Sequence, residues 1–202
     1  AGDTTNDPNG GNSIGIDYGE YSNLTFKSEL TIGNIIVAGS KNYGLRMANI
    51  FTGNNAYFDK GTTIKSGGAG KKILVQGKKN VGVSIAKFLS SAANTNPIAN
   101  ISDLNVTLAG EESIGFLRNK DYSSNNTNDM VFDSTTMGVF ELGKGAKNST
   151  LIRTDKYGVQ VRKDITSTGK DDHGNDNTGS GNTILHANGE TQHIHNYNKI
   201  TV

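Results

Sequence analysis

The sequence contains no cysteine, no tryptophan and only two prolines in 202 residues. Without cysteine, the chain can have neither a disulfide scaffold nor thiolate metal ligands. Apolar residues are also scarce at 33% of the chain, and no window approaches the roughly 18 apolar residues of a membrane helix. We therefore expect no membrane insertion by this segment, and an ordinary two-layer enzyme core is disfavoured.

The chain also lacks an excess of charge of either sign, since 20 basic and 19 acidic residues leave a net charge of +1. No run of lysine and arginine has the length expected at a phosphate-binding surface, so nucleic acid is not a predicted partner. Residues 1–13 lack the basic and apolar regions of a signal peptide, which leads us to expect a mature, internal or truncated chain. A GxSxG serine motif, a phosphate loop and a dinucleotide fingerprint are all absent, and we predict no cofactor.

Glycine, asparagine, serine and threonine dominate what is present. The chain has 26 glycines, 25 asparagines and 36 serines plus threonines, which together make 87 of its 202 residues. Glycine and asparagine accept left-handed backbone angles at sharp turns, and the hydroxyl and amide side chains suit outward-facing positions. This composition fits a narrow fold that needs only one apolar face per strand.

One short tract recurs along the chain. Residues 35–44 read IIVAGSKNYG, residues 73–82 read ILVQGKKNVG, and residues 106–115 read VTLAGEESIG. Looser copies at 10–16, 131–138 and 151–158 extend the series to six. The second glycine of each copy anchors the alignment, and the six anchoring glycines are Gly15, Gly44, Gly82, Gly115, Gly138 and Gly158.

Variable spacing between these glycines, 29, 38, 33, 23 and 20 residues, favours a fixed strand with loops of different lengths. We predict an all-β chain folded as a right-handed parallel β-helix, a β-solenoid with side loops of variable length. The alternative for the same glycines is ordinary hairpin turns in an antiparallel sandwich. The residues before the glycines are expected to form a stacked ladder in the interior: Ile14, Tyr43, Val81, Ile114, Met137 and Tyr157.

We expect one β-helix segment over 1–202, with the clear repeats at about 10–165 and terminal strands at 183–202. Polar loops interrupt it at 94–100, 119–129 and 167–182, and exposed loops on a rigid scaffold are common recognition sites. The longest loop is the predicted binding site, through the following residues: Lys170, Asp171, Asp172, His173, Asn175 and Asp176.

Metal binding is weighed at two places and is not predicted at either. The loop 167–182 offers oxygen ligands for Ca²⁺, but it lacks the alternating acids and terminal Glu of an EF-hand and the GGxGxD repeat of calcium β-rolls. His193 and His195 alternate on one strand face and could bind Zn²⁺ with His186 or His173, although such a pair is more often an exposed face.

An enzyme is the main functional alternative, because parallel β-helices include polysaccharide lyases and glycosidases. Such reactions need paired carboxylates or a metal with a basic residue in one groove. The acidic residues here are scattered along the chain, and Asp133 and Arg153 are expected to form a cross-strand ion pair instead. We therefore predict no catalytic residue and no enzymatic activity.

At the three decamers and at residues 119–159, the chain resembles the passenger region of large type V autotransporters, in particular fusobacterial autotransporter adhesins. The likeness covers about residues 10–165. It implies a right-handed β-helix carried through the outer membrane by a C-terminal barrel and displayed on the cell surface. Signal peptide, linker helix and barrel are missing here, and the segment matches no binding motif known to us.

The resemblance implies a non-enzymatic adhesin segment with a role in virulence, which attaches to host cells or other bacteria through a glycan or protein receptor. A carbohydrate-active β-helix enzyme is the first alternative. The second is a stalk spacer that has no ligand of its own.

Overall fold

The computed structural model describes residues 13–18, 29–47, 63–68, 70–85, 104–118, 130–132, 140–156, 158–162, 164–166, 181–190 and 193–201. All regular structure in these ranges is β-strand, which confirms the all-β class expected from the sequence. The same ranges contain no helix that is long and apolar enough to span a membrane.

The strands are short, and most coincide with the alternating apolar residues of the sequence. They are β1 (Ile14–Tyr18), β2 (Glu29–Ile32), β3 (Ile35–Val37), β4 (Tyr43–Met47), β5 (Thr63–Ser66), β6 (Ile73–Val75), β7 (Val81–Ile85), β8 (Val106–Leu108), β9 (Ile114–Arg118), β10 (Met130–Phe132), β11 (Phe140–Leu142), β12 (Thr150–Lys156), β13 (Val159–Val161), β14 (Ile165–Thr166), β15 (Thr183–Glu190), β16 (Ile194–Asn196) and β17 (Ile200–Thr201).

These strands pair in parallel throughout the described ranges. The largest sheet has the order β1-β4-β7-β9-β12-β15, and a second has the order β11-β8-β6-β3. A three-stranded sheet, β10-β13-β16, and two strand pairs complete the set. Parallel pairing contradicts the hairpins of an antiparallel sandwich, because a hairpin pairs its strands antiparallel.

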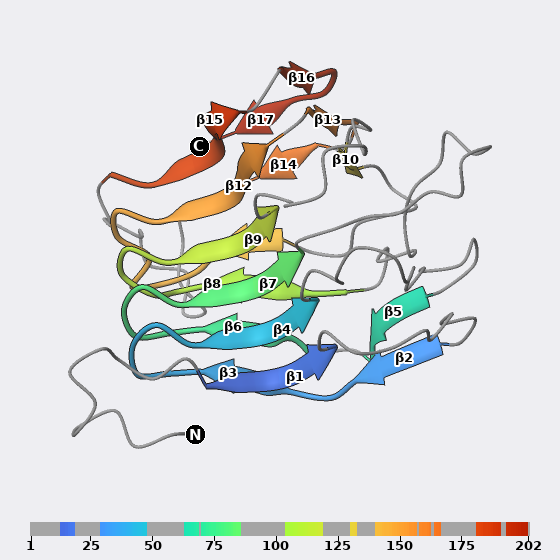
Figure 1. Ribbon diagram of the computed structural model, residues 1–202, viewed down its shortest axis with the longest axis vertical. Coiled ribbons are helices and arrows are strands. Elements are labelled where there is room, and N and C mark those ends of the chain that lie inside the picture. Colours follow the sequence, from blue (N-terminus) through green and yellow to red (C-terminus); the bar gives the residue numbers. More distant parts are fainter. Residues whose placement is uncertain are drawn as a thin grey trace.

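Four times the chain runs from the four-stranded sheet through a short turn into the six-stranded sheet, and each such unit is called a rung here. The rungs are β3–β4, β6–β7, β8–β9 and β11–β12. They lie one above another in Figure 1, with β1 at one end and β15, β16 and β17 at the other. The fold thus repeats one strand–turn–strand path in register.

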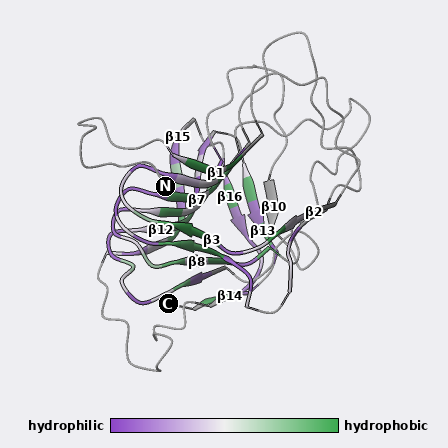
Figure 2. Ribbon diagram, turned by 90° about the horizontal axis from the view of Figure 1, so that it is seen from below, coloured by the Kyte–Doolittle hydropathy of each residue, from purple (hydrophilic) through white to green (hydrophobic). Residues whose placement is uncertain are grey.

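The core lies between the facing sheets. Its central members come from alternate positions of the four-stranded sheet and from the middle of each strand in the six-stranded sheet. Seen along the stack in Figure 2, hydrophobic colour marks β3 and β8, and hydrophilic colour marks the turns that connect the facing sheets. The fully buried side chains include Leu45, Ile73, Leu104, Leu108, Phe116, Leu151 and Ile152.

The ladder predicted for the interior forms in register but contributes little to the core, since Val81 is buried whereas Ile14, Tyr43 and Ile114 are only partly buried. Ile14, Tyr43, Val81 and Ile114 are paired partners on successive strands, yet none belongs to the core cluster. A Cβ added at the following glycine, Gly44, would approach core side chains, so it is the glycine that faces inward. Met137 and Tyr157 lie outside the described residues, and Thr150 and Thr183 continue the ladder.

The inward column contains only four of the six predicted glycines: Gly15, Gly44, Gly82 and Gly115. After them the register places Leu151 and Ile184, two buried core residues. Gly158 instead precedes β13 in the three-stranded sheet, and Gly138 lies outside the described residues. Larger side chains replace glycine at the last two levels and fill the interior there.

A hydrogen-bonded column of side chains holds the turns together. The residue before each strand of the six-stranded sheet, from Asn42 onward, accepts a side-chain bond from the corresponding backbone N–H one level earlier, and Ser13 supplies the first N–H. Its members in order are Ser13, Asn42, Asn80, Ser113, Ser149 and Asn182. The column satisfies buried amides that have no strand partner at the turn and fixes the register between rungs.

Candidate functional site

The loop predicted to bind a ligand falls almost entirely outside the described residues. The structure does not describe the range 167–180, which contains all six predicted binding residues: Lys170, Asp171, Asp172, His173, Asn175 and Asp176. The loops 94–100 and 119–129 are also outside the described residues. Residues 181 and 182 are described, and they belong to the stacked turns rather than to a side loop. Gly181 has a φ of 79°, and Asn182 accepts the N–H of Ser149.

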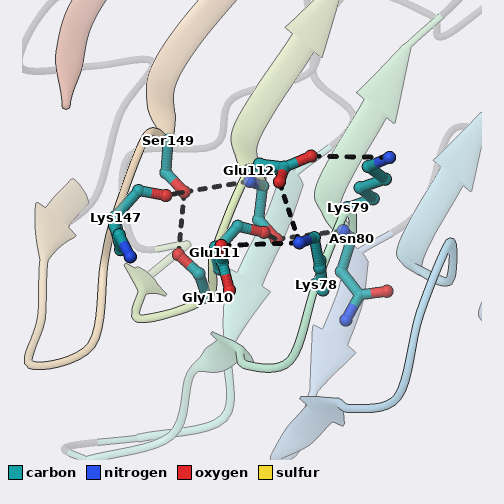
Figure 3. A network of polar contacts seen from close by, with 9 residues as sticks. Lys78, Lys79, Asn80, Gly110, Glu111, Glu112, Lys147 and Ser149 are labelled. Carbon is teal, nitrogen blue, oxygen red and sulfur yellow. Dashed lines mark hydrogen bonds and ion pairs between the residues drawn. The ribbon is translucent and has the colours of Figure 1, made fainter. Parts of the chain in front are cut away.

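Two surfaces of the described chain carry polar groups in a defined arrangement. The first is the turn ridge, formed by the exposed charged residues of the stacked turns in Figure 3. Lys78 contacts Glu111 at 3.4 Å and Glu112 at 2.9 Å, and Lys79 contacts Glu112 at 3.5 Å. Opposite charges on neighbouring turns therefore meet across the stack.

The ion pairs of the turn ridge shift the protonation equilibria of two members. The hydrogen bond to Glu112, together with the charges of Glu111 and Glu112, raises the pKa of Lys78 above its ordinary 10.5. The hydrogen bond from Lys78, with the charges of Lys78 and Lys79, lowers the pKa of Glu112 below its ordinary 4.5. Both shifts favour the charged forms, as expected for an ion pair.

The backbone under the turn ridge is constrained. Lys41, Lys79, Glu112 and Asn148 have φ values of 58°, 58°, 49° and 50°, at aligned positions in successive turns. Residues other than glycine rarely adopt a positive φ, and each one costs about 1 kcal/mol or more of folding free energy. Because the charges of Lys78, Lys79, Glu111 and Glu112 are already paired within the chain, we interpret this part of the ridge as stabilising the stack.

The second surface is the outer face of β13 and β16 and the residues that follow these strands, here called the C-terminal face. Val159 and Val161 are buried in the core, so Gln160 and Arg162 lie on the opposite, outward side of β13. Gln160 is paired in register with His195 on β16. Tyr197 follows His195 at the next outward position, and 60% of its surface is exposed.

Close contacts hold these side chains in place. The guanidinium of Arg162 lies over the ring of Tyr197, 5.5 Å from its centroid, and its Nη2 donates to Oε1 of Gln160 at 2.6 Å. The hydroxyl of Tyr197 is 3.0 Å from Nδ1 of His195, and the His195 and His193 rings have centroids 4.6 Å apart. The group is thus both exposed and arranged before any ligand binds.

Arg162 differs from Arg153, although β12 and β13 are consecutive strands on the same level of the stack. Nε of Arg153 pairs with Oδ1 of Asp155 at 2.7 Å. Arg162, by contrast, is exposed and has no carboxylate partner among the residues that the structure describes. The ion pair predicted between Asp133 and Arg153 involves a residue, Asp133, that lies outside the described ranges. Arg162 is therefore a positioned cation that a ligand can reach.

The histidines weighed as Zn²⁺ ligands separate into two sheets. His193 and His195 lie side by side at β16, whereas His186 pairs with Arg153 in the six-stranded sheet. Across the described ranges, no three His, Cys, Asp or Glu residues gather as they would around a metal ion. His173 lies outside these ranges.

Sequence reasoning noticed His193 and His195 but not Arg162 or Tyr197. The pattern HIHNY places three aromatic rings at alternate positions, and period-two spacing was the available signal. Arg162 could not be found in this way, because 35 residues separate it from Tyr197 and only the parallel pairing of β13 with β16 brings them together.

No protein-family model matches the chain, and neither the curated proteins nor the solved structures contain a match.

Proposed function

We propose that the chain is part of a right-handed parallel β-helix that acts as a non-enzymatic adhesin segment on the bacterial cell surface. The β-helix is supported by the repeated path through the sheets and by in-register parallel pairing at every level described. The hand follows from the strong preference of crossover connections between parallel strands for right-handedness.

The observation that carries the adhesin proposal is the C-terminal face. Arg162, His195 and Tyr197 are exposed and fixed by mutual contacts on two paired strands of a rigid sheet. Tyrosine and arginine are the residue types enriched where proteins bind partners. A surface of this kind suits attachment, because it presents an ordered contact area with little entropy left to lose on binding.

The partner under this proposal is a glycan or protein receptor on a host cell or another bacterium, and the resemblance of the decamers to autotransporter passengers supports it. The same resemblance supports anchoring at the outer membrane through a C-terminal barrel. The proposal includes neither nucleic acid nor a cofactor, and it includes no catalytic residue.

The carboxylates of the described chain support a non-enzymatic role. Paired catalytic carboxylates must face a common substrate groove. Here the acidic side chains have other partners: Glu111 and Glu112 contact lysines, Asp155 contacts Arg153, Glu141 accepts from Thr107 at 2.6 Å, and Asp164 accepts the N–H of Lys199 at 3.0 Å.

Adhesion can be tested with beads coated with the purified chain and applied to panels of host cells and bacteria. We expect coated beads to attach well above beads coated with the heat-unfolded chain. Attachment to no cell type would contradict the adhesin and favour the stalk spacer. Release of reducing ends or unsaturated sugars from a glycan panel would instead favour the enzyme.

A further inference from the structure

Arg162 offers an exposed positive charge that the described chain leaves uncompensated by any carboxylate. The guanidinium donates through Nη2 to Oε1 of Gln160 and lies over the ring of Tyr197, and Arg162 is exposed, so the hydrogen bond to Gln160 uses only one of its nitrogens. A planar guanidinium binds a carboxylate through two parallel hydrogen bonds, and a fixed guanidinium loses less entropy when it does so.

Tyr197 supplies a second contact of a different kind. Most of its side chain is exposed, although burial of an aromatic side chain is favourable. An exposed ring next to hydrogen-bonding groups offers a flat apolar surface on which the C–H face of a sugar can pack. The neighbouring polar groups of Gln160, His195 and Asn198 can serve its hydroxyls.

The charges around this face limit the charge of the ligand. Among the described residues that follow β13 and β16, the other ionised groups are Lys199 and Asp164, and Oδ1 of Asp164 accepts from the Lys199 N–H at 3.0 Å and from Nδ2 of Asn198 at 3.3 Å. One uncompensated guanidinium beside a carboxylate matches a ligand with a single negative charge. A polymer with many sulfates or phosphates would require several cations.

We propose that Arg162, His195 and Tyr197 bind a carboxylate-bearing sugar of an acidic glycan. Arg162 pairs with the sugar carboxylate, Tyr197 packs against the ring face, and His195 orients the Tyr197 hydroxyl through its Nδ1 contact. This inference rests on the proposed adhesin function, because it names the ligand class of the same surface.

The test uses the full chain and an array of saccharide pairs, in which each carboxylated uronic or nonulosonic acid glycan is printed beside its neutral counterpart. We expect binding to one or more carboxylated members and at least about tenfold weaker binding to their neutral counterparts, the loss expected for one charge-assisted bidentate contact. Arg162→Gln should reduce the carboxylated signal to the neutral level, and Tyr197→Ala should weaken both signals.

Arg153→Gln is the matched control, since it makes the same change at an arginine that already has a carboxylate partner. It should leave glycan binding unchanged within about twofold, the scatter expected for a distant site. Arg162→Lys keeps the charge but not the planar fork and should recover only part of the binding. An unchanged circular dichroism spectrum and melting temperature establish that the variants are folded.

The inference is overturned if no carboxylated glycan binds, if neutral counterparts bind equally well, or if Arg162→Gln binds as the unmodified chain does. Equal binding to sulfated counterparts would also overturn the assignment to carboxylates. If any of these results is found but coated beads still attach to cells, the ligand assignment is wrong and the adhesin function is retained. Failure of the beads to attach would remove the proposed function itself.

Discussion

The backbone N–H of Asn42 donates to Oδ1 of Asn80 across 2.7 Å, although the two residues are 38 positions apart in the chain. Nδ2 of Asn80 in turn donates to the carbonyls of Gln76 and Gly39. One fully buried amide therefore links its own turn to the turn of the preceding level. The hydrogen-bonded column repeats this device with asparagine or serine at every described turn that precedes a strand of the six-stranded sheet.

Replacing Asn80 with alanine should destabilise the stack. The change leaves the buried N–H of Asn42 and the carbonyl of Gln76 without their partner, and such unmet groups cost about 1–3 kcal/mol. We expect a loss of about 2 kcal/mol in the free energy of unfolding, measured by urea denaturation.

Asn34→Ala is the control for that loss. Asn34 also accepts a backbone N–H from the next level, from Lys72 at 3.3 Å, but the bond is exposed and water can replace it. Its effect should stay below about 0.5 kcal/mol. Equal effects of the two changes would show that burial of the column does not matter.

Gly82→Ala should destabilise the chain because a methyl group has no space at this position. Its Cβ would lie 2.7 Å from the carbonyl oxygen of Gly115 and 2.8 Å from a methyl carbon of Val75. Overpacking of this kind costs about 1–3 kcal/mol, and the melting temperature should fall accordingly. Gly33→Ala has no atom within 4 Å of the added carbon and should leave the melting temperature nearly unchanged. A fall as large for Gly33 would contradict the steric explanation.

The sequence predicted the strands well where the repeat is strict. The three decamers place β3 and β4, β6 and β7, and β8 and β9 correctly, because glycine is needed wherever the facing strands approach closely. The prediction failed at the next level, where Leu151 occupies the glycine position and fills the interior. The position shared by all levels is the asparagine or serine of the turn, whose role depends on hydrogen bonds between turns and is hidden in one sequence.

The C-terminal face was less predictable for a physical reason. Alternation indicated that His193 and His195 share one side of a strand, which is a local property. Arg162 and Tyr197 lie side by side only because β16 follows β13 in the sheet and pairs with it in this register. The register of β13 with β16 depends on the length of the loop between them. Because loop lengths vary from one repeat to the next, the repeat pattern does not predict this register.

The ion pairs of the turn ridge predict a pH-dependent part of the stability. The pKa of Glu112 is lower in the folded chain than its ordinary 4.5, so its contribution is present above pH 4.5 and is lost as the pH falls through the folded value. The pKa of Lys78 is raised above 10.5, so its contribution is present below pH 10.5 and is lost as the pH rises through the folded value.

Melting temperatures measured from pH 2 to pH 7 should separate the contribution of the Glu112 ion pairs from the pH dependence of the other acidic residues. Glu112→Gln should flatten the acidic part of the curve, and Lys78→Met should flatten it in part, because Lys79 still contacts Glu112. The double variant should be flatter than Lys78→Met alone. These side chains are well exposed, so the effect should be small and should shrink in 1 M salt. A difference that persists in salt would indicate a cause other than charge.

Arg118→Met should loosen the attachment of β13 to the six-stranded sheet. Arg118 is only 4% exposed, and its Nη1 donates to the carbonyl of Gly158 at 2.9 Å, directly before β13. A buried hydrogen bond from a charged donor is worth about 1.5–3 kcal/mol. Its loss should therefore speed amide hydrogen exchange in 159–161 more than in β4 or β7, when peptides from each strand are compared by mass spectrometry. Arg153→Met removes a partly exposed arginine from the adjacent strand and should leave exchange in 159–161 unchanged. If Arg118→Met accelerates exchange equally in all strands, the side chain supports the whole stack instead of this attachment.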